Sequence, residues 1–153
     1  MKNTAMRYIG MPQETNDEEI KEQITQAFKS LEEIARPKVT YQRVKISKEE
    51  EKITFEGTYC QVTSKDLGKL LRNSSECILM AATLGMEVDR TIGNLQKTDM
   101  LKAMILDACA SVLIDKLCDD AEAKIMNELA ENEYLTMRFS PGYGDVPLET
   151  SAD

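Results

Sequence analysis

Hydrophobic residues recur at helical spacing in the first third of the chain. The apolar positions lie three or four residues apart, the period of one face of a helix: Ile20, Ile24, Ala27, Phe28, Leu31 and Ile34. Asp17 precedes this stretch and has a side chain suited to capping a helix start. Arg36 and Pro37 follow it, and the residue before a proline avoids the helical region of backbone space. The pattern therefore predicts a helix over residues 18–35.

The longest helical pattern begins after Thr98 or Asp99. Its apolar positions again repeat at three and four: Met100, Leu101, Met104, Ile105, Ala108, Cys109, Val112 and Leu113. Continued to Glu133, such a helix would be ~50 Å long, whereas a compact domain of this size has a radius of gyration near ~15 Å. We expect a central helix that either bends or breaks near Asp119 and Asp120 or overhangs the rest of the domain.

Alternating and continuous apolar stretches predict the strands. Residues 39–46 alternate as a half-buried strand does, the charged run at residues 48–52 is typical of a hairpin turn, and residues 53–62 predict a second strand. The run "ECILMAATLG" at residues 76–85 is apolar almost throughout, which favours a strand buried on both faces. Residues 134–137 predict a further short strand.

The remaining segments complete an α+β pattern. Ser64 is a plausible cap for a short helix ending near Leu71, and "MEVDRTIGNLQ" after Gly85 predicts another helix. Strands that are partly consecutive and partly separated by helices favour a mainly antiparallel, twisted sheet with helices packed on it. We expect residues 1–16 to form an irregular arm and residues 17–153 to form a single domain, because 153 residues can bury one sizeable core.

Composition and charge narrow the class of function. Acidic residues outnumber basic ones by 27 to 19, for a net charge of −8. This balance argues against binding to nucleic acid or to an anionic membrane surface. The chain has neither an apolar run near the ~20 residues of a spanning helix nor a signal-peptide core at its start. We therefore expect a cytoplasmic protein.

The chain contains no histidine. This absence excludes Ser–His–Asp and Cys–His nucleophile pairs, zinc sites with histidine ligands, and the usual general base near neutral pH. The cysteines are scattered without a CxxC pair, which favours buried thiols over a zinc or iron–sulfur site: Cys60, Cys77, Cys109 and Cys118. We predict no metal site and no catalytic residue, and a binding protein becomes more plausible than an enzyme that works alone.

Candidate chemistry concentrates in "RFSPGYGDVPLE", residues 138–149. Pro141 fixes its own backbone, while Gly142 and Gly144 can adopt positive φ and leave their amides open to a ligand. Arg138 offers a planar donor fork for a carboxylate, and Tyr143 offers a flat face for an adenine or a sulfonium. The alternative is a structural loop in which Tyr143 packs on the core and Arg138 pairs with a surface acid.

Several blocks of the chain together resemble a known family. "RFSPGYGD", with Arg138, Gly142 and Tyr143 in an Arg-x-x-x-Gly-Tyr pattern, is similar to the activation (reactivation) domain of vitamin B12-dependent methionine synthase. The stand-alone proteins of anaerobic bacteria that carry this domain also share "AATLGxxVDxxI", matched by residues 81–92, and the Thr-Asp-Met at residues 98–100. "RYIGM" near the start also matches, so that the resemblance covers most of residues 5–149.

The resemblance implies a function in methyl transfer. In the family, the domain binds S-adenosylmethionine and docks on the cobalamin-binding module after the cobalt has been oxidised. One electron, from a reductant such as flavodoxin, and the methyl group of S-adenosylmethionine then restore methylcobalamin. By this resemblance Arg138 would help hold the methionine portion of the cofactor, and Gly142 and Tyr143 would shape the cleft beside it. Pro141 and Gly144 would contribute loop geometry. Cobalamin would be present only through the partner methyltransferase.

The resemblance also leaves alternatives open. Family members continue past this loop with a further helix and strands, so we expect the C-terminal part of the family fold to be absent. The chain could then be a docking module for a corrinoid methyltransferase that has lost cofactor binding. An independent enzyme based on carboxylates is a third possibility, although no paired acids lie in a recognisable catalytic context.

Overall fold

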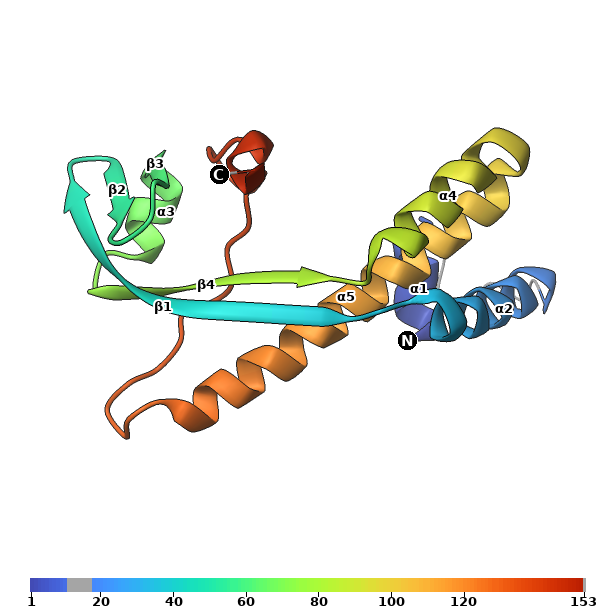
Figure 1. Ribbon diagram of the computed structural model, residues 1–153, viewed down its shortest axis with the longest axis horizontal. Coiled ribbons are helices and arrows are strands. Elements are labelled where there is room, and N and C mark those ends of the chain that lie inside the picture. The colour runs from blue at the N-terminus through green and yellow to red at the C-terminus, as the bar shows by residue number, and fades with distance from the viewer. Residues whose placement is uncertain (11–17, 153) are drawn as a thin grey trace. The chain divides into compact units, whose positions relative to one another are not determined.

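The computed structural model describes residues 1–10 and 18–152. Helices lie at both ends of the element order, and the strands lie between them in the sequence (Figure 1). The elements are α1 (Lys2–Tyr8), α2 (Glu18–Ile34), β1 (Lys38–Glu49), β2 (Lys52–Phe55), β3 (Gln61–Thr63), α3 (Lys65–Leu70), β4 (Glu76–Thr83), α4 (Met86–Thr98), α5 (Met100–Glu128) and the 3-10 helix η1 (Leu148–Ala152).

The strands form one curled antiparallel sheet in the order β3-β2-β1-β4. Ile46 pairs with Phe55 and Glu49 with Lys52 in the first hairpin, and Ile53 pairs with Val62 in the second. The predicted α+β class with an antiparallel sheet is confirmed at this level. No described helix is long and apolar enough to cross a membrane.

The contacts of the described residues divide the chain into two compact units. Unit 1 consists of residues 1–40 and 81–127, and unit 2 consists of residues 41–80 and 128–153. The chain therefore passes between the units three times, within β1, within β4 and at the end of α5. The assignment of residues 17–153 to a single domain stays a prediction.

The core of unit 1 is helical. Ile24 and Leu31 of α2 have no exposed surface and pack with Val88 of α4 and with Cys109 of α5. The predicted helix over residues 18–35 is confirmed as Glu18–Ile34, and its predicted cap, Asp17, lies outside the described residues. Burial raises the pKa of the Cys109 thiol to about 12, as expected for a thiol surrounded by hydrocarbon.

Helix α1 corrects the prediction of an irregular arm. Lys2–Tyr8 are helical, while residues 11–16 of the expected arm lie outside the described residues. Ala5 is fully buried and Met6 is 2% exposed, both against the helical core of unit 1. A helix of seven residues has little stability of its own, so this burial, and not propensity, accounts for it.

Helix α5 is continuous over its 29 residues, so a break near Asp119 and Asp120, one of the expected alternatives, does not occur. Neither aspartate removes a backbone donor as a proline would, and the stretch contains no glycine. The predicted start is confirmed, because Asp99 Oδ1 accepts a hydrogen bond from the Lys102 amide at 3.1 Å. This bond is the main reason that the pKa of Asp99 lies below its usual value.

The core of unit 2 lies on one face of the hairpins. It is formed by Val44, Ile46, Ile53, Phe55, Val62, Leu67, Leu71 and Val146.

The turn between β1 and β2 is shorter than the predicted turn of residues 48–52, because only Glu50 and Glu51 separate the paired residues Glu49 and Lys52. Lys48 belongs to β1, and its Nζ donates to the carbonyls of Leu71 and Ser74 at 2.9 and 2.7 Å.

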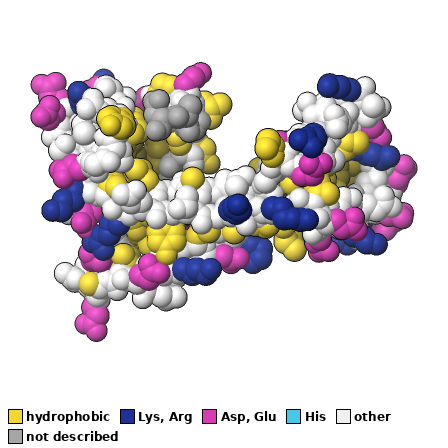
Figure 2. Space-filling model, viewed as in Figure 1, with side chains coloured by type: hydrophobic (Ala, Val, Ile, Leu, Met, Phe, Trp, Pro, Cys, Tyr) yellow, Lys and Arg dark blue, Asp and Glu magenta, His cyan; other side chains and the backbone are white. Residues whose placement is uncertain are grey.

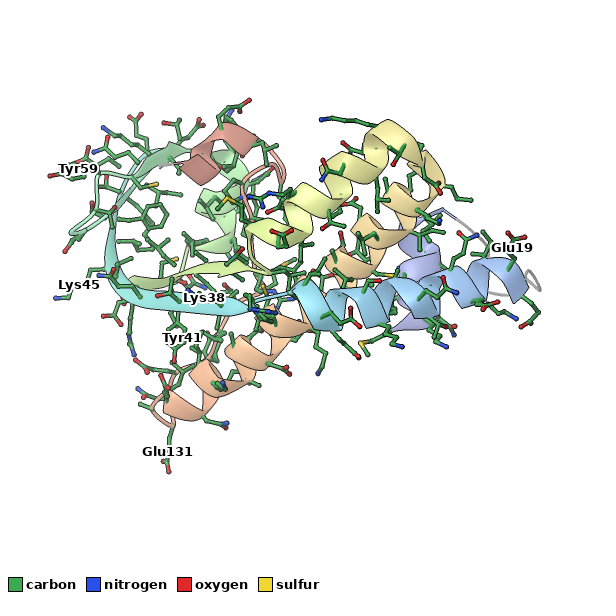
Figure 3. All side chains as sticks on the ribbon, turned by 45° about the vertical axis from the view of Figure 1, so that its right-hand side comes forward. Glu19, Lys38, Tyr41, Lys45, Tyr59 and Glu131 are labelled. Atoms are coloured by element: carbon green, nitrogen blue, oxygen red, sulfur yellow. The ribbon has the colours of Figure 1, made fainter. Side chains whose placement is uncertain are left out.

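The predicted strand over residues 53–62 is wrong at its centre. A turn over residues 56–60 divides it into β2 and β3, and Gly57 adopts a φ of 79° there. Thr58 Oγ1 donates to the Phe55 carbonyl at 2.8 Å and fixes the turn. Tyr59 projects fully into solvent at this tip (Figure 3).

The strand predicted over residues 134–137 is also wrong, because these residues join no sheet. The chain leaving α5 is held instead by polar contacts to β1. Tyr41 Oη donates to Glu128 Oε1 at 3.1 Å (Figure 3), and the Arg43 guanidinium bridges Glu76 of β4 and Glu133. The bond from Arg43 lowers the pKa of Glu133.

Strand β4 is confirmed, but it is half-buried and not covered on both faces.

Ser64 caps α3 as predicted. Its Oγ accepts a hydrogen bond from the Leu67 amide at 3.0 Å, and the residue is 1% exposed. We expect Ser64→Ala to reduce the free energy of unfolding by about 0.5–2 kcal/mol, the usual cost of losing a cap. Urea denaturation monitored by circular dichroism measures this loss. Ser74→Ala is the matched control, since its hydroxyl makes no hydrogen bond among the described residues, and an equal loss in the two variants would contradict the prediction.

Candidate functional site

The predicted site residues lie in one irregular segment of unit 2, residues 138–147, which we call the C-terminal loop. Its backbone folds back on itself through three hydrogen bonds. The Tyr143 amide donates to the Ser140 carbonyl at 3.0 Å, the Val146 amide to the Tyr143 carbonyl at 3.1 Å, and the Gly142 amide to the Val146 carbonyl at 2.9 Å. Pro141, Gly142, Tyr143 and Gly144 are therefore brought together in one compact turn.

Both glycines adopt the left-handed conformation that the sequence predicts for them. Gly142 has a φ of 89° and Gly144 a φ of 53°. A Cβ on Gly144 would lie 2.7 Å from Asp66 Oδ2, and one on Gly142 would lie 3.3 Å from Leu148 Cδ1. The loop thus requires glycine at Gly144 both for its backbone angle and for its close approach to α3.

Two hydrophobic contacts fix the loop on unit 2. Val146 is 5% exposed and belongs to the core, and Phe139 packs against the same core. The Phe139 and Tyr143 rings meet edge to face, with their centroids 6.0 Å apart. Tyr143 is nonetheless 58% exposed, so that much of its ring remains available to a ligand.

Two of the predicted site residues are exposed and carry polar groups. Arg138 and Gly144 are exposed, and the Gly144 amide has no acceptor among the described residues. An arginine side chain, an open amide and an aromatic ring are groups that suit a small molecule with an anionic end and a flat or cationic end. Of the predicted alternative, the packing of Tyr143 is limited to its ring contact with Phe139, and the pairing of Arg138 with a surface acid stays a prediction.

Asp145 is a functional candidate that the sequence reasoning missed. Its carboxylate accepts hydrogen bonds from the Ser64 hydroxyl, from the Lys65 amide at 2.8 Å and from the Asp66 amide at 3.4 Å. The bond from Ser64 is the main cause of a pKa below the ordinary value of 3.8. The only available signal was that Asp145 follows the loop glycines, which does not reveal a partner 81 residues away.

The lowered pKa of Asp145 predicts a pH dependence. Because the folded-state pKa lies below the unfolded value, the ionised carboxylate stabilises unit 2 fully above about pH 4, and this stabilisation is lost as the pH falls through the folded-state pKa. We expect Asp145→Asn to reduce the drop in urea midpoint between about pH 7 and pH 3. An undiminished drop in the variant would assign the acid sensitivity to other carboxyls such as Glu133.

Two acidic residues outside the loop, Glu87 and Asp99, form local ion pairs. Glu87 pairs with Arg90 at 3.2 Å in α4, and Asp99 pairs with Lys102 at 3.4 Å in α5. Within the described residues, no three His, Cys, Asp or Glu side chains gather where they could hold a metal ion. On the face shown in Figure 2, acidic and basic side chains are interspersed over both parts of the molecule.

Comparison with known protein families finds no family model that matches this chain, and a search of characterised proteins likewise finds no match. The case for a function therefore depends on the C-terminal loop and on the sequence blocks around it.

Proposed function

We propose that this chain is an accessory subunit or domain of a cobalamin-dependent methionine synthase that binds S-adenosylmethionine through its C-terminal loop. The observation that carries the proposal is that Gly142 and Tyr143 of the Arg-x-x-x-Gly-Tyr pattern lie in a turn held by three backbone hydrogen bonds, with Tyr143 58% exposed and the exposed residue Arg138 just before the turn. Such preorganisation lowers the entropy that a ligand must overcome on binding.

The donor set fits this cofactor chemically. Arg138 can form paired hydrogen bonds to the carboxylate of the methionine portion. The Tyr143 face can stack on the adenine or lie against the sulfonium, and the Gly144 amide can donate to a further ligand oxygen. S-adenosylmethionine supplies an electrophilic methyl group, and the nucleophile would be the reduced cobalt of the partner.

The residues of this chain would then bind and orient, and would transfer no proton. Methyl transfer from a sulfonium requires placement of the methyl group against its acceptor, not a general base. A chain without histidine is compatible with that task. The partner would be a corrinoid-binding methyltransferase, and an electron donor such as a flavodoxin-like protein would serve it.

Isothermal titration with S-adenosylmethionine tests the proposal. We expect the wild-type chain to bind and Arg138→Ala to bind about 10- to 100-fold more weakly, since a hydrogen bond to a charged group contributes about 1.5–3 kcal/mol. Arg72→Ala, which removes another exposed arginine of unit 2, is the matched control and should bind as the wild type does.

Absence of heat in a folded wild-type chain would overturn cofactor binding. In that case, capture of a purified corrinoid methyltransferase by the chain would favour the docking module instead. Equal affinity of Arg138→Ala and the wild type would remove Arg138 from the binding residues.

A further inference from the structure

The Asp145 side chain attaches the C-terminal loop to the start of helix α3 through hydrogen bonds. We infer that Asp145 is the positioning residue of the ligand-binding loop: it holds Gly142 and Tyr143 in the binding arrangement without touching the ligand. This inference rests on the proposed function, and it adds a residue that lies outside the Arg-x-x-x-Gly-Tyr pattern.

Both oxygens of the Asp145 carboxylate are already committed. Oδ1 accepts from the Ser64 hydroxyl and, at 3.4 Å, from the Asp66 amide, while Oδ2 accepts from the Lys65 amide at 2.8 Å. A carboxylate at the start of a helix is also favoured by the helix dipole. Asp145 is therefore turned toward α3.

The partner of Asp145 is rigid. Ser64 is 1% exposed, and its hydroxyl both donates to Asp145 and accepts from the Leu67 amide at 3.0 Å. Leu67 in turn belongs to the core of unit 2. The hydrogen bonds thus connect the loop to a buried part of the unit and not to a mobile surface side chain.

The residues on either side of Asp145 transmit this attachment to the ligand-facing groups. Gly144 precedes it and approaches α3 so closely that a Cβ would contact Asp66. Val146 follows it, is buried in the core, and shares hydrogen bonds with Gly142 at 2.9 Å and with Tyr143 at 3.1 Å. Moving Asp145 away from α3 would therefore displace the backbone of both ligand-facing residues.

The expected loss of affinity follows from the fraction of molecules in which the C-terminal loop is attached to α3. If only a fraction of the molecules holds the loop in place, the apparent dissociation constant rises by the inverse of that fraction. A variant in which the loop is attached about one tenth of the time would bind about tenfold more weakly. The Gly142 and Val146 amides, which are bonded within the same loop, would lose nearly all of their protection against hydrogen exchange, because protection scales with the ratio of attached to detached molecules.

The test compares Asp145→Asn with Glu149→Gln by two measurements, titration with S-adenosylmethionine and hydrogen exchange of the Gly142 and Val146 amides by NMR. Glu149 lies four residues further along and its substitution makes the same change of charge. We expect Asp145→Asn to lose about tenfold in affinity and nearly all of the amide protection, and Glu149→Gln to change neither.

Each outcome decides between distinct interpretations. Weaker binding with unchanged amide protection would mean that Asp145 contacts the ligand, and would overturn its role as a positioning residue. Unchanged binding and unchanged protection would overturn it as well. If the wild-type chain binds no S-adenosylmethionine, the proposed function fails, while the exchange measurement still shows whether Asp145 holds the loop. Ser64→Ala, which removes the partner hydroxyl, should reproduce the effect of Asp145→Asn on protection.

Discussion

Replacing Met6 with alanine is expected to reduce the free energy of unfolding by about 2–5 kcal/mol, the range for emptying a buried site of this size. Met6 is 2% exposed and lies in the helical core of unit 1 together with Ile24 and Cys109. Alanine has a slightly higher helix propensity than methionine, but that gain is only a few tenths of a kcal/mol. Urea denaturation followed by far-ultraviolet circular dichroism measures the loss.

Two control variants make the Met6 prediction specific. Met1→Ala changes the same residue type near the same helix, where the side chain is 63% exposed, and should be neutral within about 0.5 kcal/mol. Met6→Leu keeps most of the volume and should cost less than about 1.5 kcal/mol. If Met6→Ala is as stable as Met1→Ala, helix α1 does not contribute to the core in solution.

This prediction concerns the segment in which the sequence was least informative. Residues 1–10 contain too few apolar positions to display a helical period, and Gly10 follows the helix closely. The helix is explained by the burial of Ala5 and Met6 against residues distant in sequence. Burial of that kind cannot be inferred from a local pattern, because it depends on where the other helices lie.

Longer elements were predictable because their signals are repeated many times. Helix α2 shows its apolar stripe over about four turns, and its end follows from the proline after Arg36. The caps at Ser64 and Asp99 were also predictable, because each side chain bonds an amide only three residues away. Local hydrogen bonds of this type can be predicted from the sequence, because the capping residue and its partner lie close together in the chain.

The errors in the strands and in α5 have identifiable physical causes. Gly57 lies inside the predicted strand over residues 53–62, whereas its positive φ makes the turn that separates β2 from β3. The expected break in α5 came from the dimensions of one compact domain, while the contacts divide into two units and no helix-breaking residue intervenes. Residues 134–137 have strand-like composition but make no strand pairing, and Glu133 is held by Arg43 instead.

The backbone turn of the candidate site was predictable from the sequence, but the hydrogen bonds that attach the loop to α3 were not. Pro141, Gly142 and Gly144 indicated a tight turn with positive φ, and the turn and both angles are confirmed. The role of Asp145 was hidden because its partners, Ser64 and the amides of α3, lie about 80 residues earlier in the chain. A loop's shape is encoded locally, whereas its attachment depends on tertiary structure.

Replacing Gly85 with alanine is the second substitution with a large expected effect, a loss of about 1–3 kcal/mol in the stability of unit 1. Gly85 joins β4 to α4 with φ 94° and ψ 151°, a region that is almost exclusive to glycine. A Cβ there would lie 3.3 Å from Arg36 Cβ and 3.5 Å from the Arg36 amide nitrogen. The Arg36 backbone cannot retreat easily, because its amide donates to the Leu84 carbonyl at 2.7 Å.

Gly93→Ala is the matched control for Gly85→Ala. Gly93 lies inside helix α4, where a Cβ would meet no atom within 4 Å, so alanine should stabilise the chain by about 0.5–1 kcal/mol. Replacing glycine with alanine is thus expected to lower the free energy of unfolding at Gly85 and to raise it at Gly93, eight residues later. Thermal or urea denaturation of the two variants compares them directly. A Gly85→Ala variant as stable as Gly93→Ala would show that the β4–α4 junction does not need the glycine conformation, and that Arg36 does not hold the junction as tightly as its hydrogen bond to Leu84 indicates.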